Sequence, residues 1–346
     1  MKKNPFCLSI LLILFACNSK TDAPDVSGIG IDLATLRFER DFFSIDTSNL
    51  PVSLMGLQSK YPGFAEDFLE NILGIPIADT NPDAAFAIKK FIVDYAAVRD
   101  STTRIFDGFE QQEKEIRRGL QFVKYYFPEY PTPEKLITFI GPLDAYFQAS
   151  TSGYGDIITP DGLGIGLQLH MGRKSSFYTS ELGRQLYPQY ISRRFEPNYI
   201  PVNCMKNIID DIFPDQSVGK PLVEQMIDKG KRLYVLDRLI PLTHDTLKLG
   251  YTADQLKGCI SNEGLIWNFF VENNLLYEAD PMKIKSFVND APKTAELGDE
   301  SPGFISLFIG RQIVKAYMEK FPETRLQDLL RLEAGKIFAD SKYKPR

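Results

Sequence analysis

The chain has 346 residues, of which 44% are hydrophobic and 25% are charged, and its formal net charge is −5. This balance is typical of a globular protein and excludes a disordered chain, a collagen-like repeat and a membrane protein with many spans. The chain contains only two histidines, His170 and His244, which lie far apart in the sequence. Chemistry built on clustered histidines is therefore disfavoured.

The first 16 residues have the pattern of a bacterial secretory signal peptide. Lys2 and Lys3 precede a short apolar stretch, residues 8–15, which ends at Ala16 and Cys17. This stretch is too short to cross a bilayer as a stable helix. Residues 14–17, Leu-Phe-Ala-Cys, resemble a lipobox, in which the cysteine is acylated and becomes the new N-terminus. We therefore predict lipid attachment at Cys17 and a lasting membrane anchor; an ordinary cleaved signal is the alternative.

Residues 17–28 are polar and rich in turn-forming residues, which indicates a flexible tether between the lipid and the domain. Loss of Lys2 and Lys3 with the signal leaves 38 basic and 45 acidic residues, a formal charge of −7. This charge disfavours nucleic acid as a partner. Cys204 and Cys259 would then be the remaining thiols, either joined in a disulfide or unlinked in the core.

The hydrophobic pattern predicts an α+β fold with a small sheet and many helices. Partial alternation indicates a strand in residues 29–43, and the next segments have a helical period. The predicted helices of this half are residues 54–61, 64–73, 83–98 and 105–126. A short apolar run follows at 135–140, and residues 155–171 read as strands on both sides of a turn at 160–162. Nearly everything from residue 181 onwards reads as helix.

The glycine-rich segment 162–166 does not match a phosphate-binding loop. It lacks the helix start of a dinucleotide fingerprint, and no lysine followed by Ser or Thr comes after it. Glycines in a strand more often allow another backbone to approach closely, which is the structure we expect here. The sequence has no Gly-x-Ser-x-Gly elbow of a serine hydrolase. Its carboxylates are too evenly spread for a glycosidase pair to be chosen.

The predicted helix at residues 199–213 places Asn203 and Asn207 four residues apart, with Cys204 beside Asn203. In a zinc peptidase helix of the His-Glu-x-x-His kind, two histidines hold the metal at this spacing and the glutamate activates water. Neutral amides are poor zinc ligands, and Cys204 cannot replace the carboxylate base. The helix could not perform that reaction; a polar, solvated helix face is the simpler interpretation.

The predicted helix at residues 221–236 has a glycine, Gly230, in its middle. A glycine there costs ~1 kcal/mol relative to alanine, which predicts that another part of the chain packs closely against it. Lys229, Lys231 and Arg232 surround this glycine, and a solvated basic turn is the simpler interpretation. If this helix lies beside that of Asn203, the ammonium of Lys229 would repel a divalent metal.

The chain as a whole resembles the gliding-motility lipoprotein family GldB of the Bacteroidota. The resemblance extends from about Ile29 to Pro345 and is carried by the order of many short motifs rather than by one motif. Those motifs lie at residues 162–167, 171–172, 177–178, 188–190, 194–195, 230–241, 250–252, 262–263, 266–267, 275–277, 301–303, 308–310, 313–314, 317–318 and 341–345.

The GldB family is in turn similar to predicted zinc peptidases that have a His-Glu-x-x-His helix followed by a helix with a Glu-Gly pair. This correspondence puts Asn203 and Asn207 at the histidine positions, Cys204 at the catalytic glutamate, and Lys229 at the third ligand before Gly230. None of the four matches the metal-binding pattern. The resemblance thus implies a vestigial cleft in a zincin-like domain, residues 29–346, with no metal, no cofactor and no catalytic residue.

The leading hypothesis is a lipid-anchored, non-catalytic protein of the cell envelope, facing the periplasm. The resemblance implies that it acts with other envelope proteins of the gliding and type IX secretion machinery. An alternative is an envelope hydrolase that acts on peptide or cell-wall substrates through carboxylates the sequence does not identify. A third possibility is a periplasmic receptor for a small ligand, which a ligand that co-purifies with the protein would indicate.

Overall fold

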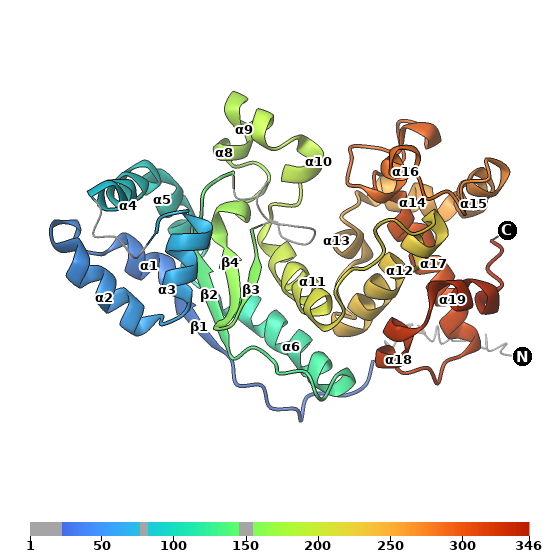
Figure 1. Ribbon diagram of the computed structural model, residues 1–346, viewed down its shortest axis with the longest axis horizontal. Helices are drawn as coiled ribbons and strands as arrows, with labels where there is room; N and C mark the ends of the chain where they lie inside the picture. The colour runs from blue at the N-terminus through green and yellow to red at the C-terminus, as the bar shows by residue number, and fades with distance from the viewer. Residues whose placement is uncertain (1–22, 77–81, 145–154, 346) are drawn as a thin grey trace, which may run out of the picture.

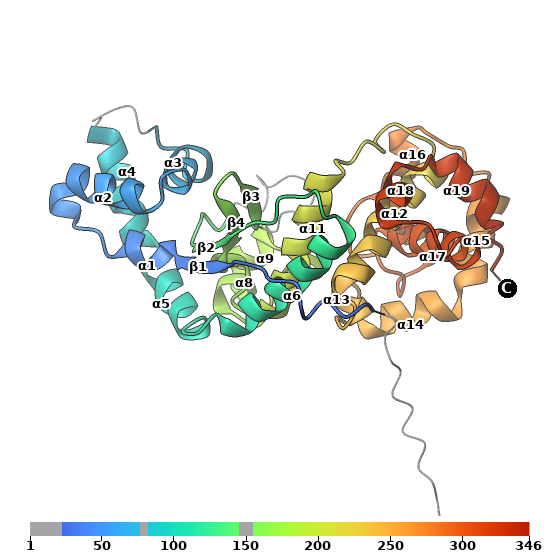
Figure 2. The same cartoon turned by 90° about the horizontal axis from the view of Figure 1, so that it is seen from below.

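The computed structural model describes residues 23–76, 82–144 and 155–345. The predicted signal peptide, Cys17 and the first part of the tether lie outside the described residues. Figures 1 and 2 show an elongated molecule, with the sheet between helices α1 to α5 at one end and helices α12 to α19 at the other. Among the described residues, no helix combines the length and the apolar character needed to span a membrane.

A four-stranded sheet with the order β1-β2-β4-β3 forms the centre of the fold. Its strands are β1 (Ala34–Arg37), β2 (Lys135–Phe139), β3 (Ile157–Thr159) and β4 (Gly162–Gly166). β1, β2 and β4 are parallel, and β3 pairs antiparallel with β4 at the edge. A small sheet in a mostly helical chain was predicted, and both strands around the turn at 160–162 are confirmed.

The glycines of β4 allow close backbone approach, as predicted. A methyl group placed on Gly162 would lie 2.3 Å from the carbonyl oxygen of Lys135, and one on Gly166 would lie 2.6 Å from the carbonyl oxygen of Gly155. Larger residues would therefore push apart the strand β2 and the segment that leads into β3. These glycines have a structural explanation that does not involve phosphate.

An aromatic cluster fastens the N-terminal helices to the sheet. Phe38 of α1 contacts Phe64 of α3 and Phe68 in the π-helical turn that follows, and Phe42 of α1 contacts Phe38 and Phe68. Phe64 and Phe68 in turn contact Phe139 of β2. The elements of this end are α1 (Phe38–Phe43), α2 (Leu50–Lys60), α3 (Phe64–Asp67), the π-helix Phe68–Ile72, α4 (Pro82–Asp94) and α5 (Ala96–Ile105). Edge-to-face ring contacts and complete burial make this cluster a large share of the core.

The strand predicted over residues 29–43 is mostly wrong, because only 34–37 form a strand. The carbonyls of Ile29 and Leu33 accept hydrogen bonds from Gln121 and Arg117 of α6 (Glu110–Tyr126), so this segment follows a helix instead of a neighbouring strand. The tether region also differs from a free linker: Val26 is fully buried. Phe38 and Phe42 then share one helical face, which favours a helix from residue 38.

Helices α6 and α11 (Ile200–Ile212) run next to each other beside the sheet (Figure 1). They approach so closely that a methyl group on Gly119 of α6 would lie 2.6 Å from the sulfur of Met205 of α11. The preceding short helices are α8 (Ser176–Thr179), α9 (Glu181–Leu186) and α10 (Gln189–Ser192). The predicted helix at 199–213 is confirmed, whereas the one predicted at 105–126 begins only at Glu110.

The C-terminal half is a helical layer built around the crossing of α12 (Leu222–Leu239) and α17 (Ile305–Lys320). A methyl group on Gly230 would lie 2.2 Å from the backbone carbonyl of Gly310, and one on Gly310 would lie 1.7 Å from the carbonyl oxygen of Met226. The close packing predicted at Gly230 is confirmed. The remaining helices are α13 (Asp245–Leu249), α14 (Ala253–Ser261), α15 (Glu263–Glu272), α16 (Pro281–Val288), α18 (Leu326–Arg331) and α19 (Ala334–Ser341).

The substitution Gly230→Ala should therefore lower the free energy of unfolding, because the new methyl group has no space between two helix backbones. We expect a loss of at least ~2 kcal/mol in urea denaturation. Gly258→Ala is the matched control, since Gly258 also lies inside a helix but has open space around its Cα. Its helix propensity should raise stability by about 0.5–1 kcal/mol. Equal effects of the two substitutions would contradict the close crossing.

Candidate functional site

A buried polar network holds α11 against the edge of the sheet. Both carboxylate oxygens of Asp156, just before β3, lie 2.9–3.0 Å from His170 Nε2. The same carboxylate accepts a hydrogen bond from Asn203 Nδ2 at 2.8 Å and from the backbone N–H of Gly166 at 3.1 Å. The backbone carbonyl of Asp156 accepts one from Asn207 Nδ2 at 3.1 Å. One aspartate thus joins β4, α11 and the loop of His170.

This network is closed to solvent. His170 is 0% exposed, and Asp156 and Asn203 are each 1% exposed. A carboxylate buried in this way is tolerated only where hydrogen bonds satisfy it, and three donors reach it here, from His170, Asn203 and the backbone of Gly166. No substrate reaches Asp156 or His170 in this arrangement. The histidine and the aspartate therefore anchor the helix and do not form an accessible acid–base pair.

The two thiols of the predicted mature chain are free and buried. Desolvation and the charge of Asp156 raise the pKa of the Cys204 thiol well above its ordinary value. Burial also raises the pKa of the Cys259 thiol, to about 12. Of the two interpretations that the sequence left open, the unlinked pair is confirmed. A protonated thiol is a poor nucleophile and a poor metal ligand.

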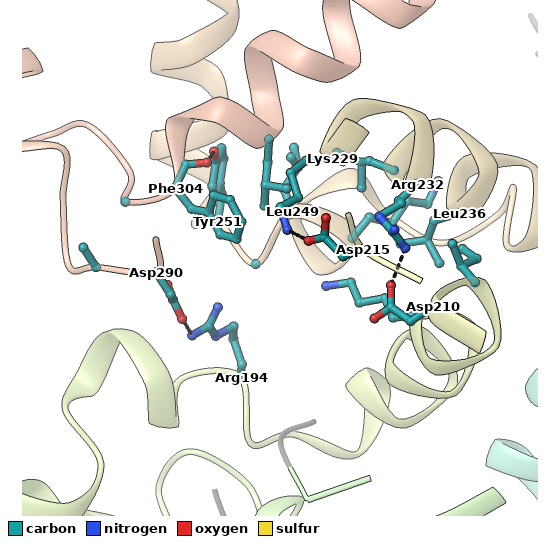
Figure 3. Close-up of a pocket in the computed structure, with 18 of the residues that line it drawn as sticks. Arg194, Asp210, Asp215, Lys229, Arg232, Leu236, Leu249, Tyr251, Asp290 and Phe304 are labelled. Carbon is teal, nitrogen blue, oxygen red and sulfur yellow. Dashed lines mark hydrogen bonds and ion pairs between the residues drawn. The ribbon is translucent and has the colours of Figure 1, made fainter. Parts of the chain in front are cut away.

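A pocket of about 150 Å³ opens on the next side of α11, toward α12 (Figure 3). Lys206, Ile209 and Asp210 of α11 line it, and α12 contributes Lys229, Arg232, Leu233 and Leu236. Segments from five other places complete the wall: Arg193 and Arg194, Asp215, residues 248–251, residues 290–291, and Gly303, Phe304 and Leu307 around the start of α17. The pocket thus lies where the sheet-bearing part of the chain meets the C-terminal helices.

Three ion pairs define the polar part of this pocket (Figure 3). Arg232 Nη1 donates to Asp210 Oδ1 at 2.7 Å and bridges α12 and α11. Arg194 pairs with Asp290, and Lys229 pairs with Asp215. Burial raises the pKa of Asp215, but hydrogen bonds from Lys229 and Ser217 outweigh it and hold that pKa at about 2.

Lys206 is the basic residue of this pocket whose charged form is least stabilised by its surroundings. Nothing in the described part of the chain makes a hydrogen bond or an ion pair with its ammonium within the usual distances. Desolvation and the positive charge of Arg194 lower the pKa of Lys206 to about 8, although Asp210 and Asp290 oppose the shift. The charged form of Lys206 therefore costs stability in the empty pocket.

The structure separates the five residues that the resemblance placed in a vestigial cleft. Lys229 lines the pocket, while Asn203 and Asn207 bond to Asp156. Cys204 lies in the hydrophobic core, and Gly230 faces α17. The asparagines are not on a solvated face, and Lys231 and Arg232, which looked like a solvated basic turn, have side chains only 3% and 11% exposed.

Sequence reasoning did not identify Asp156, or the role of His170 beside it. His170 reaches the same carboxylate as Asn203. Lys206 was also missed. Its signal was available, because it is the one basic residue in the apolar stretch 199–209. A lone lysine in such a stretch indicates either a snorkelling side chain or a functional group.

A comparison with protein families matches residues 19–345 to the family described as "Gliding motility protein GldB". No curated protein and no solved structure matches the chain significantly. The assignment to this family therefore rests on the sequence match alone.

The substitution Lys206→Met should raise stability at neutral pH, because it removes a partly buried charge that makes no ion pair within the described residues. The folded-state pKa of about 8 lies below the value of an unfolded lysine, so the unfolded chain binds more protons between these two pH values. The cost of Lys206 is thus complete below pH ~8 and disappears towards pH ~10.5. We expect the variant to exceed the wild type by on the order of 2 kcal/mol at pH 7 and the gap to shrink at pH 10.

Urea denaturation at both pH values measures this gap. Lys257→Met, on the exposed side of α14, removes the same charge and should leave stability unchanged at either pH. A destabilised Lys206→Met variant at pH 7, or a gap that is independent of pH, would show that Lys206 has a stabilising partner.

Proposed function

The chain belongs to the family of the gliding motility protein GldB, and we propose that it is a lipid-anchored, non-catalytic component of the gliding machinery in the cell envelope. Three features support this proposal. The sequence begins with a lipobox-like signal that ends at Cys17. The family match covers nearly the whole of the given sequence, residues 19–345. The helix that would hold zinc in a related peptidase has other contacts.

The side chains that α11 offers as possible metal ligands support the non-catalytic part of the proposal. Zinc prefers thiolates, neutral imidazoles and carboxylates as ligands. Asn203 and Asn207 offer neutral amides whose N–H groups already donate to Asp156, and the Cys204 thiol stays protonated. Elsewhere in residues 23–76, 82–144 and 155–345, no group of three His, Cys, Asp or Glu side chains is arranged to hold a metal ion. These residues do not fit zinc, and we derive no hydrolytic step.

The proposed role of the fold is to present surfaces to other envelope proteins close to the membrane. Residues 23–28 support this view, since Val26 is buried and the segment that follows bonds to α6. The folded part thus starts within a few residues of the predicted lipid. A zincin-like ancestry remains part of the proposal, and its support is the order of sheet, α11 and α12.

A gene deletion with complementation tests this function. Loss of the gene should reduce surface spreading of the source bacterium, and the wild-type gene should restore it. Cys17→Ala should fail to restore spreading, because the protein then lacks its acyl chains and leaves the membrane. Cys7→Ala is the matched control, since it changes a cysteine in the same leader outside the lipobox-like motif. Normal spreading of the deletion strain, or full rescue by Cys17→Ala, would contradict the proposal.

A further inference from the structure

The pocket between α11 and α12 has more basic than acidic groups, in a protein whose overall charge is negative. Six basic side chains and three aspartates line it. Each aspartate is already paired with one of the six, and Lys248 lies 3.1 Å from Asp237, which is outside the lining. Lys206 adds a positive charge that makes no ion pair within the described residues. A pocket of this kind favours an anion.

Hydrogen-bond donors suited to an anion are present at this place. The ammonium of Lys206 lines the pocket, and no acceptor from the described chain reaches it. Arg232 donates a hydrogen bond from Nη1 to Asp210. Its Nε and Nη2 are buried and have no hydrogen-bond partner among the described residues. Buried donors without acceptors are costly, and a ligand that supplies the acceptors would remove this cost.

The rest of the wall is apolar. Leu236 of α12 lies on one side, and Leu249, Tyr251 and Phe304 lie on another (Figure 3). Leu233 of α12 also lines the pocket. Tyr251 is held in place because its hydroxyl donates to the carbonyl of Phe304 at 3.0 Å. A bare inorganic ion would leave these side chains facing water. An apolar wall beside convergent polar groups is typical of sites for small organic ligands.

From this geometry we propose that the pocket binds a small organic anion, a carboxylate or phosphate joined to an apolar group of a few carbon atoms. Lys206 and Arg232 would bind the anionic group, and Leu233, Leu236 and Phe304 would contact the apolar part. The volume of about 150 Å³ suits such a molecule and is too small for a folded segment. The inference goes beyond the proposed function and does not depend on it.

Calorimetric titration of the full chain in a non-ionic detergent tests the inference, with detergent alone as the blank. The probes are hexyl phosphate and hexanoate. Inorganic phosphate is the control for the anionic group alone, and 1-hexanol is the control for the apolar part alone. We expect one of the two organic anions to bind at least about tenfold more tightly than either control. The stronger of the two anions identifies the anionic group. Binding of both anions no tighter than that of 1-hexanol would overturn the inference.

Variants decide whether the binding occurs at this pocket. Lys206→Met should weaken binding of the preferred anion at least about tenfold, because a charge-assisted contact is lost. Lys206→Arg should retain most of it, and Lys257→Met should bind like the wild type. If Lys206→Met does not fold, Lys206→Gln serves in its place as a neutral polar variant. Unchanged binding in the neutral variant would place the anion elsewhere and overturn the inference.

Discussion

The carboxylate of Asp156 is the contact on which the arrangement of the site depends. It is buried at the edge of the sheet and accepts hydrogen bonds from His170, Asn203 and the backbone of Gly166. These bonds fix the rotation of α11 about its axis, because Asn203 and Asn207 must face the sheet. The next side of the same helix then carries Lys206 and Asp210 towards α12.

The second constraint is the crossing of α12 and α17. Gly230 and Gly310 bring the two helix backbones into contact, so the position of α12 is fixed against α17. The pocket lies between these two rigid contacts. Lys206 is therefore held near Arg194, whose charge lowers its pKa, while Asp210 and Asp290 offset part of this shift. Positioned charges of this kind cost stability and are often found at functional sites.

Local sequence patterns predicted much of the fold. The hairpin around residues 160–162, the helices of residues 199–213 and 221–236, and the close packing at Gly230 all follow from period, turn residues and glycine placement. The segment 29–33 could not be predicted, because its carbonyls bond to side chains of α6 that are far away in the sequence. The Asp156 network was also hidden, since its members come from three separate segments.

The candidate site, like the fold, could be predicted only in part from the sequence. The sequence pointed to Asn203, Cys204 and Asn207 as a departure from a zinc-binding pattern, but it gave no sign that the two asparagines are committed to Asp156. Lys229 was correctly placed on the helix that lies next to α11, whereas its partner Asp215 could not be inferred from spacing. Buried polar partners are determined by the tertiary structure, and local patterns in a single sequence do not identify them.

The central claim is that α11, the helix that the resemblance compares with a zinc peptidase helix, is an internal structural element and not a metal site. The most direct measurement is the zinc content of the protein purified from its native membranes without chelators, determined by mass spectrometry. The account predicts zinc far below one ion per chain, with no increase after dialysis against zinc. One tightly bound zinc per chain that is lost in an Asn203→Ala, Asn207→Ala double variant would contradict it.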